Sequence, residues 1–236
     1  MHICTPRTTI ELQRLHSEVL ACRKCALAGH LWEAHPVAGG WATAQVMVIG
    51  QAPGVRSMVH GAHFKGPGGR LLREWIARGG IPHEDQERDV YLSSLTRCYP
   101  GPAPRGGAGD RKPSPAEIAL CEPYLTRELE LLDPCLVILV GGMAIERFLG
   151  KGPLRERVGT LIEAHGRHWL PLPHPSGVSR WLNDPDHKRL VDKALEKMRL
   201  FIESRMNRAE MRAQAGKPVV AEPISTRLYP ALPPPL

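Results

Sequence analysis

The stretch VMVIGQAPG, Val46 to Gly54, decides how the chain folds. Its first five residues form an apolar run without polar alternation, which is typical of a parallel strand buried on both faces. The run ends abruptly in Gly50-Gln51-Ala52-Pro53-Gly54, a turn that brings polar groups to the end of the strand. Ligands of open parallel sheets bind beyond the carboxyl ends of the strands. We therefore expect this turn to form one wall of a ligand cleft, with Gln51 as its only functional side chain.

Outward from this stretch, short buried strands alternate with helices. Further strands are expected at 89–95, at 135–142 and within 168–177, and helices at 8–21, 69–80, 114–132, 143–150 and 184–206. The helix at 114–132 opens with Ser114 as the N-cap, Pro115 in the first turn and Glu117 as the partner in a capping box. The alternation predicts an α/β fold, a three-layer α/β/α sandwich around a central, mostly parallel four-stranded sheet.

The chain of 236 residues has room for one sizeable α/β domain. We expect a single domain over residues 1–204 and a Pro-rich, extended or disordered tail over 205–236, where the periodicity fades. No apolar run reaches the length of a membrane span, and the N-terminal residues lack the basic-then-apolar pattern of a secretory signal. These features predict a cytoplasmic protein.

The charge of the chain gives nucleic acid a modest lead over small molecules as a partner. The formal net charge is +7 and the isoelectric point is about 9.3. From Arg205 onward there are five basic and two acidic residues, so the tail carries +3 and the domain only +4. Arg97 and the loop after Cys98 together supply four basic residues suited either to phosphate contacts or to a solvated surface: Arg97, Arg105, Arg111 and Lys112.

Four of the six cysteines form a pattern that needs an explanation. Cys22 and Cys25 share one local turn, and Cys98 and Cys121 follow singly. Disulfides are an unlikely use for them in a reducing cytoplasm. A zinc ribbon normally presents two close CxxC pairs, so the spacing favours a [4Fe–4S] cluster that staples the N-terminal helix to the core. Four unrelated reduced cysteines are the alternative. Cys4 lies near the terminus, and Cys135 fits a buried strand.

Six blocks together resemble the iron–sulfur branch of the uracil-DNA glycosylase superfamily, its families 4 and 5. The blocks are CRKCAL (22–27), VMVIGQAPG (46–54), GAHFKGPGGRLL (61–72), LTRC (95–98), RKPSPAEIALCEPYL (111–125) and HPSG (174–177). The resemblance implies that Cys22, Cys25, Cys98 and Cys121 hold a [4Fe–4S] cluster with a structural role. It also implies DNA base-excision repair by base flipping and hydrolysis of the N-glycosidic bond.

The same resemblance assigns roles to individual residues. His174 stabilises the departing uracil, Gln51 positions the water, and Phe64 stacks on the base. Substrate contacts also come from Gly50, Ala52, Pro53, Gly54 and Ser94, and DNA contacts from Ser176, Gly177 and Arg180. The gap left by the flipped base is filled by Val178, Arg180 or Trp181.

Two positions depart from the family pattern. Gln51 stands where family 4 has Glu, so this residue provides neither a base nor a negative charge, and we expect slower turnover rather than none. Ser94 stands where the family usually has an Asn that reads the pyrimidine edge. Base selection is therefore expected to be looser, extending to xanthine, hypoxanthine or hydroxymethyluracil. His60 and His63 flank Phe64 and are interpreted as exposed loop residues, with the supply of a missing polar contact as the alternative.

The leading hypothesis is a monomeric, monofunctional DNA glycosylase that excises uracil and other deaminated bases. The alternative is a DNA- or damage-binding iron–sulfur protein of the same fold with little or no catalysis, which Gln51 and Ser94 keep open. A third hypothesis, a four-cysteine zinc module without a base pocket, is weaker because it leaves the GQAPG turn and His174 without a purpose.

Overall fold

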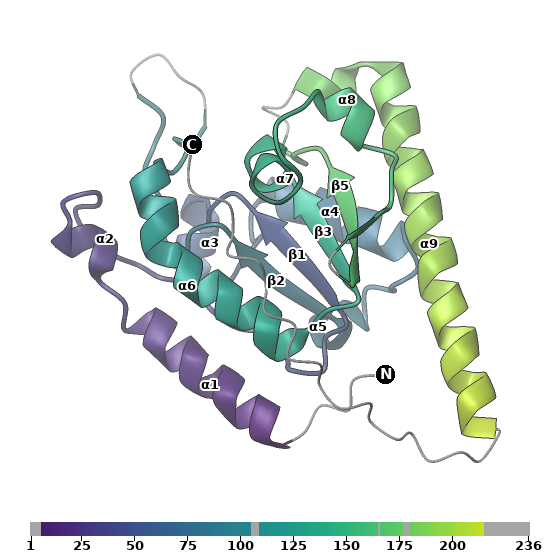
Figure 1. Cartoon of the computed structure of the whole chain (residues 1–236). Helices are drawn as coiled ribbons and strands as arrows, with labels where there is room; N and C mark the ends of the chain where they lie inside the picture. Colours follow the sequence, from purple (N-terminus) through teal and green to yellow (C-terminus); the bar gives the residue numbers. More distant parts are fainter. Residues whose placement is uncertain (1–5, 105–108, 165, 177–179, 215–236) are drawn as a thin grey trace.

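The centre of the protein is a twisted sheet whose strands run in the order β2-β1-β3-β5-β4 (Figure 1). The computed structural model describes residues 6–104, 109–164, 166–176 and 180–214. The strands are β1 (Val46–Gly50), β2 (Val90–Ser94), β3 (Leu136–Val140), β4 (Ile162–Ala164) and β5 (Arg167–Leu172). The first three and β5 are parallel, whereas β4 pairs antiparallel with β5. The predicted α/β class is confirmed.

The sheet has five strands rather than the four expected from the sequence. The additional strand is β4, which pairs Ile162 with Trp169 at the edge of the sheet. A segment of three residues is too short to show an alternating pattern, and none of its residues is fully buried. Sequence periodicity therefore could not separate it from a loop.

Helices connect the strands and cover both faces of the sheet. They are α1 (Pro6–Leu20), α2 (Lys24–Leu27), α3 (Val55–His60), α4 (Pro67–Arg78), α5 (Gln86–Asp89), α6 (Pro115–Leu132), α7 (Gly142–Leu149), α8 (Leu154–Arg157), the 3₁₀ helix η1 (Arg180–Asn183) and α9 (Pro185–Gln214). The capping box of α6 is confirmed: Ser114 Oγ accepts from the Glu117 backbone N–H at 3.2 Å, and Glu117 accepts from the Ser114 backbone N–H at 2.7 Å.

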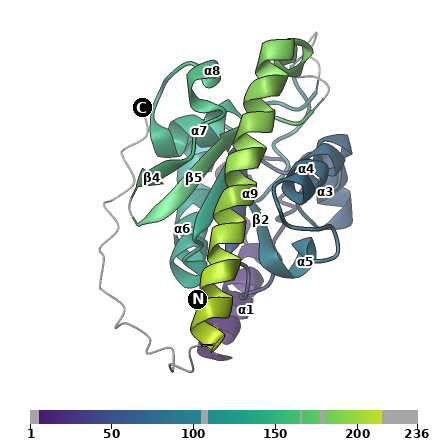
Figure 2. The same cartoon turned by 90° about the vertical axis from the view of Figure 1, so that its right-hand side faces the viewer.

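Alternate residues of the central strands point to two separate apolar layers. On one face, Val46 and Val48 pack with side chains of α4 and α9. On the other face, Met47 and Ile49 pack with side chains of α1, α6 and α7. Figure 2 shows α9 crossing one face of the sheet, with α6 and α1 behind it. This is the three-layer sandwich that buried parallel strands require.

The closing helix α9 is longer than the sequence pattern indicated. It continues to Gln214, past the expected domain end at residue 204, and the Pro-rich segment 215–236 lies outside the described residues. Within the part of the chain that the structure describes, no helix is long and apolar enough to cross a membrane.

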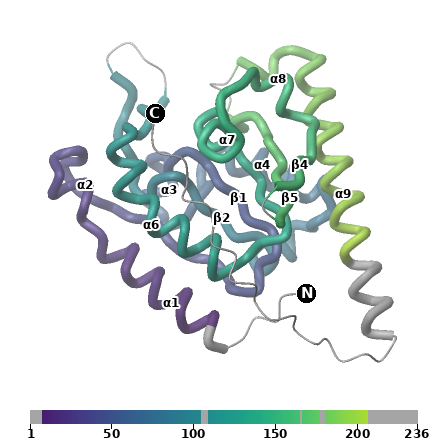
Figure 3. Tube along the Cα trace, viewed as in Figure 1, coloured from purple at the N-terminus to yellow at the C-terminus, as the bar shows by residue number. Residues whose placement is uncertain are grey.

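The topology places a switch point at the carboxyl ends of the strands. β1 has β2 on one side and β3 on the other, so the chain connections diverge beside β1. In open α/β sheets this divergence opens a ligand-binding crevice. The trace in Figure 3 shows that α1 and α2 lie on the side of the sheet that carries α6. Cys25 of α2 accordingly hydrogen-bonds Cys121 of α6.

Candidate active site

The GQAPG turn continues the sheet pairing beyond β1. The Leu95 backbone N–H donates to the Gly50 carbonyl at 2.9 Å, and the Thr96 N–H approaches the Gln51 carbonyl at 3.4 Å. These contacts fix the backbone of Gln51, while its side-chain amide makes no hydrogen bond within the described residues. Pro53 is buried, Ala52 is half-buried, and Gly54 forms the N-cap of α3. Gln51 is thus held at the strand end with a free amide.

The Phe64 ring lies against the end of β1. A β-carbon at Gly50 would stand 2.7 Å from Phe64 Cζ, so only glycine lets the ring approach this closely. Phe64 itself has a φ of 55°, a left-handed conformation that is costly for a bulky residue and is concentrated at functional sites. The Phe64 carbonyl also fills the space that a β-carbon would need if Gly69 of α4 were replaced by a larger residue. The predicted aromatic platform is therefore held from two sides.

His174 presents one defined nitrogen as a donor. The Ser176 backbone N–H donates to His174 Nδ1 at 3.2 Å, and Ser176 Oγ lies 2.9 Å from the same nitrogen. An N–H donor requires an acceptor, so Nδ1 carries no proton and Nε2 carries it. Desolvation by the surrounding protein lowers the pKa of His174, while the nearby Asp110 carboxylate acts in the opposite direction. His174 is accordingly a neutral imidazole with Nε2–H available to donate.

The loop that carries His174 packs over two other strand-end segments. A β-carbon at Gly141, directly after β3, would lie 3.4 Å from His174 Cδ2. A β-carbon at Gly68, at the start of α4, would lie 3.5 Å from the carbonyl of Pro175. The loops after β3 and β5 and the start of α4 therefore lie against one another.

Ser94 is fully buried at the end of β2 and already has partners. Its hydroxyl donates to the Thr96 carbonyl at 2.7 Å and lies 3.4 Å from His63 Nδ1.

The expectation that His63 is an exposed loop residue is wrong: its exposed fraction is 6 %, because the loop before Phe64 folds inward over β2. Burial lowers the pKa of His63 to about 3. His60 is exposed and hydrogen-bonds the Arg56 carbonyl.

Asp110 brings a carboxylate to this site that the sequence analysis missed. A β-carbon at Gly54 would stand 3.0 Å from Asp110 Oδ2, and the same carboxylate acts on the pKa of His174. Asp110 forms an isolated antiparallel β-bridge with Pro102. Burial and then the Asp110 carboxylate raise the pKa of Tyr99. A lone Asp between Gly109 and Arg111 carries no local signal, and only the folded chain brings it to the GQAPG turn.

The expected DNA-contacting residues are placed unevenly. Ser176 is half-buried beside His174, Arg180 is exposed in η1, and Trp181 is half-buried and stacks on His187. Gly177 and Val178, like Arg105, lie outside the described residues. Lys112 is exposed, whereas Arg111 binds both oxygens of Glu117 at 2.7 Å.

Arg97 is not a phosphate contact of a solvated loop. Its side chain pairs with Glu128 of α6 at 2.6 Å, and both side chains are 2 % exposed. Glu128 also accepts hydrogen bonds from Tyr91 and Ser93 of β2, and the Arg97 guanidinium donates to the Ser94 carbonyl. Sequence spacing does not reveal this pair because 31 residues separate its partners.

The four predicted cysteine ligands gather beside this network. Cys25, Cys98 and Cys121 are buried and Cys22 is half-buried. A hydrogen bond from Cys25 lowers the pKa of Cys121 to about 6, with a further contribution from the Arg97 backbone N–H, whose nitrogen lies 3.4 Å from the sulfur. Burial raises the pKa of Cys98 to about 12, and the neighbouring sulfurs of Cys121 and Cys22 act in the same direction. Three separate segments thus contribute thiols to one group.

The chemistry of this donor set fits an iron–sulfur cluster. All four donors are sulfurs, and Cys121 has the low pKa of a thiol that is ready to act as a thiolate ligand. No three of the described His, Cys, Asp or Glu side chains stand close enough to enclose a single metal ion.

The fold is that of an α/β protein with polar loops at the carboxyl ends of its parallel strands, and its relatives identify the family. A family model described as the uracil DNA glycosylase superfamily matches residues 39–199, and the chain belongs to this superfamily. Its relatives place it in the iron–sulfur branch formed by the type-4 and type-5 proteins.

Three relatives illustrate this placement. The type-4 uracil-DNA glycosylase of Thermotoga maritima is 30% identical over 200 residues, which is 83% of this chain and 97% of the relative. The type-4 uracil-DNA glycosylase of Sulfurisphaera tokodaii is 25% identical over 199 residues, covering 80% and 83% of the two chains. The type-5 uracil-DNA glycosylase of Thermus thermophilus is 30% identical over 168 residues, covering 66% and 72%.

Proposed function

We propose that the protein is a DNA glycosylase that hydrolyses the N-glycosidic bond of uracil in base-excision repair. The observation that supports this proposal is the hydrogen bonding of His174, whose Nδ1 accepts from the Ser176 backbone N–H and so leaves Nε2–H as a donor beside the end of β3. The names of the type-4 relatives support the same activity. The proposal takes DNA as the substrate and a monomer as the acting form.

Bond cleavage begins with a flipped nucleotide whose base stacks on Phe64. The bond between the sugar C1′ and uracil N1 breaks, and its electron pair moves onto the base. Negative charge develops on the uracil carbonyl oxygen, where the neutral His174 donates from Nε2. One well-placed donor of this kind contributes about 3 to 4 kcal/mol of transition-state stabilisation.

The hydrolytic water is held between Gln51 and Asp110. The Gln51 carbonyl oxygen orients the water, and the Asp110 carboxylate, next to Gly54, supplies the negative charge that Gln51 lacks. The water oxygen bonds to C1′, and one water proton passes to Asp110 and then to solvent. Uracil leaves as an anion and takes its proton from solvent.

Cys22, Cys25, Cys98 and Cys121 would hold a [4Fe–4S] cluster that joins α1, the end of β2 and α6 structurally. The bond-breaking steps use only protein side chains and water. In this proposal Ser94 and His63 select the base. The Ser94 hydroxyl already donates its proton to the Thr96 carbonyl, and its oxygen lies beside His63. This pair reads the pyrimidine edge less strictly than a free amide does.

The test is single-turnover cleavage of labelled oligonucleotides with enzyme in excess, using uracil, xanthine or hypoxanthine in single- and double-stranded DNA. We expect uracil excision, and a rate about 10²- to 10³-fold lower for His174→Ala with DNA binding retained. If the excision rate were the same in His174→Ala as in the unchanged protein, the proposed role of His174 would be wrong.

Gln51 favours a second function, that of a DNA-binding protein with little catalysis, because it removes the carboxylate from the GQAPG turn. A folded, brown, DNA-binding protein that excises none of the three bases would establish this second function. A Gln51→Glu variant that then excises uracil would identify the missing carboxylate as the cause.

A further inference from the structure

Trp32 exposes its whole indole to solvent. Its exposed fraction is 102 %, whereas Trp75 and Trp169 are 4 % and 5 % exposed. An indole is among the side chains that gain most from burial, so complete exposure at a defined position points to a binding partner.

The segment around Trp32 is pinned at both ends. The His30 backbone N–H donates to the Cys25 carbonyl at 2.9 Å, and Arg111 donates to the His30 carbonyl at 3.3 Å. Beyond Trp32, the Val37 N–H donates to the Arg97 carbonyl at 2.8 Å. The indole therefore stands on a backbone that is already ordered, which reduces the entropy lost when a partner binds.

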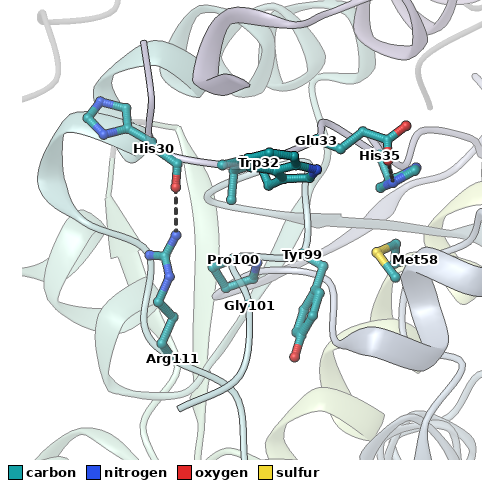
Figure 4. Close-up of a pocket in the computed structure, with 10 residues that line it drawn as sticks. His30, Trp32, Glu33, His35, Met58, Tyr99, Pro100, Gly101 and Arg111 are labelled. Atoms are coloured by element: carbon teal, nitrogen blue, oxygen red, sulfur yellow. Dashed lines mark hydrogen bonds and ion pairs between the residues drawn. The ribbon is translucent and has the colours of Figure 1, made fainter. Parts of the chain in front are cut away.

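Trp32 borders a cavity of about 330 Å³. Figure 4 shows its indole above Pro100 and Gly101, with Arg111 on one side and Met58 and His35 on the other. Arg111 on the rim is engaged by Glu117 outside the cavity, and Glu33 lies 3.2 Å from His35. Because that guanidinium is engaged elsewhere and the wall is an indole, the cavity suits an uncharged planar group better than a phosphate.

This cavity is bordered by segments that also border the GQAPG turn. Met58 belongs to α3, which follows the GQAPG turn directly. Tyr99, Gly101 and Arg111 lie on the segments beside Asp110, and Asp110 lies against Gly54. The cavity and the GQAPG turn therefore share α3 and the residues around Asp110 as neighbours.

We propose that Trp32 is a stacking platform for an unpaired nucleobase of the same DNA strand, beside the flipped nucleotide. The inference rests on the proposed function only in taking DNA as the substrate. A base inside a duplex is already stacked and paired, so this subsite favours single-stranded DNA. Stacking on an indole tolerates any base because every base has an aromatic face.

The test uses a uracil-free probe, fluorescein-labelled dT15, and measures binding by anisotropy for the complete protein and three variants. We expect Trp32→Ala to weaken dT15 binding about tenfold, which corresponds to about 1.4 kcal/mol. Trp32→Phe keeps an aromatic face and should bind within about twofold of the unchanged protein. Trp41→Ala is the matched control, because Trp41 is also exposed, at 58 %, and does not line this cavity.

Tryptophan fluorescence with unlabelled dT15 supplies a direct readout. Binding should quench part of the emission, and Trp32→Phe should lose this quench while still binding. The inference is overturned if Trp32→Ala binds dT15 as the unchanged protein does, or if Trp41→Ala loses the same affinity. Uracil excision, measured in the same preparations, is separate: a protein that binds dT15 through Trp32 yet excises nothing would contradict the proposed function and leave the stacking subsite standing.

Discussion

The edge of the Phe64 ring occupies the space that a side chain at Gly50 would need, with 2.7 Å between Phe64 Cζ and the β-carbon position. The last residue of β1 and the aromatic platform are therefore a single fitted unit. Neither can change without moving the other, and the position of the flipped base depends on both.

Gly50→Ala should displace the Phe64 ring. We expect a loss of about 1 to 3 kcal/mol in the free energy of unfolding from overpacking. A shift of about 1 Å at the base should slow excision about 10²-fold. Thermal unfolding and single-turnover excision measure the two effects. Gly142→Ala is the control, because a β-carbon there meets nothing within 4 Å. Equal excision rates for the two variants would show that the Phe64 ring does not position the base.

Asp110→Asn tests whether the carboxylate beside Gly54 replaces the acid that Gln51 lacks. We expect uracil excision to slow about 10²-fold, a usual contribution for a positioned general base. Adding Gln51→Glu should then recover a large part of the rate, since a carboxylate returns to the same crevice. Asp192→Asn, at the exposed pair with Arg78, is the control. If Asp110→Asn left the single-turnover rate of excision unchanged, the Asp110 carboxylate would have no role in catalysis.

His63 should make the protein less stable in mild acid. Its pKa is about 3 in the folded state against an ordinary value of 6.5, so below pH 6.5 the unfolded chain binds a proton that the folded chain does not. Stability is full above pH 6.5 and falls with the pH until about pH 3. The cost reaches about 2 kcal/mol at pH 5. Urea unfolding at pH 7.5 and pH 5 measures this cost, and His63→Asn should lose that share of the pH dependence. The same pH dependence in both proteins would contradict a neutral buried His63.

The cysteine group is tested by comparing two single substitutions. Cys98→Ser removes one of the four gathered thiols and should yield protein without brown colour and with reduced stability. Cys135→Ser alters a half-buried thiol that bonds the Gln45 carbonyl outside this group and should leave the colour unchanged. Iron analysis and absorption near about 400 nm measure the difference. A brown Cys98→Ser protein would remove Cys98 from the ligand set.

The fold was predictable where a local pattern carries the information. Val46 to Gly50 reads as a doubly buried strand, and Ser114 with Glu117 reads as a helix start, because a few adjacent residues contain the whole signal. β4 was missed because three residues at a sheet edge have no periodicity. The end of α9 was set too early, since its last turns lie beyond the apolar pattern that the core imposes on a helix.

The candidate site was predictable only in part. The GQAPG and HPSG motifs predict Gln51 and His174 as site residues, and both lie at the carboxyl ends of parallel strands. Asp110, the burial of His63 and the Arg97–Glu128 pair were missed, because each depends on a contact between segments far apart in the chain. Arg97 was expected to face either phosphate or solvent, because sequence composition does not reveal an ion pair between an arginine and a buried glutamate.

Arg97 contacts both the cysteine group and the end of β2. Its backbone N–H points to the Cys121 sulfur, and its guanidinium binds the carbonyl of Ser94, the last residue of β2. The thiol group and the end of β2 are therefore joined through a single residue. A rearrangement at the Cys121 sulfur would reach Ser94 through Arg97, without a change in the rest of the sheet.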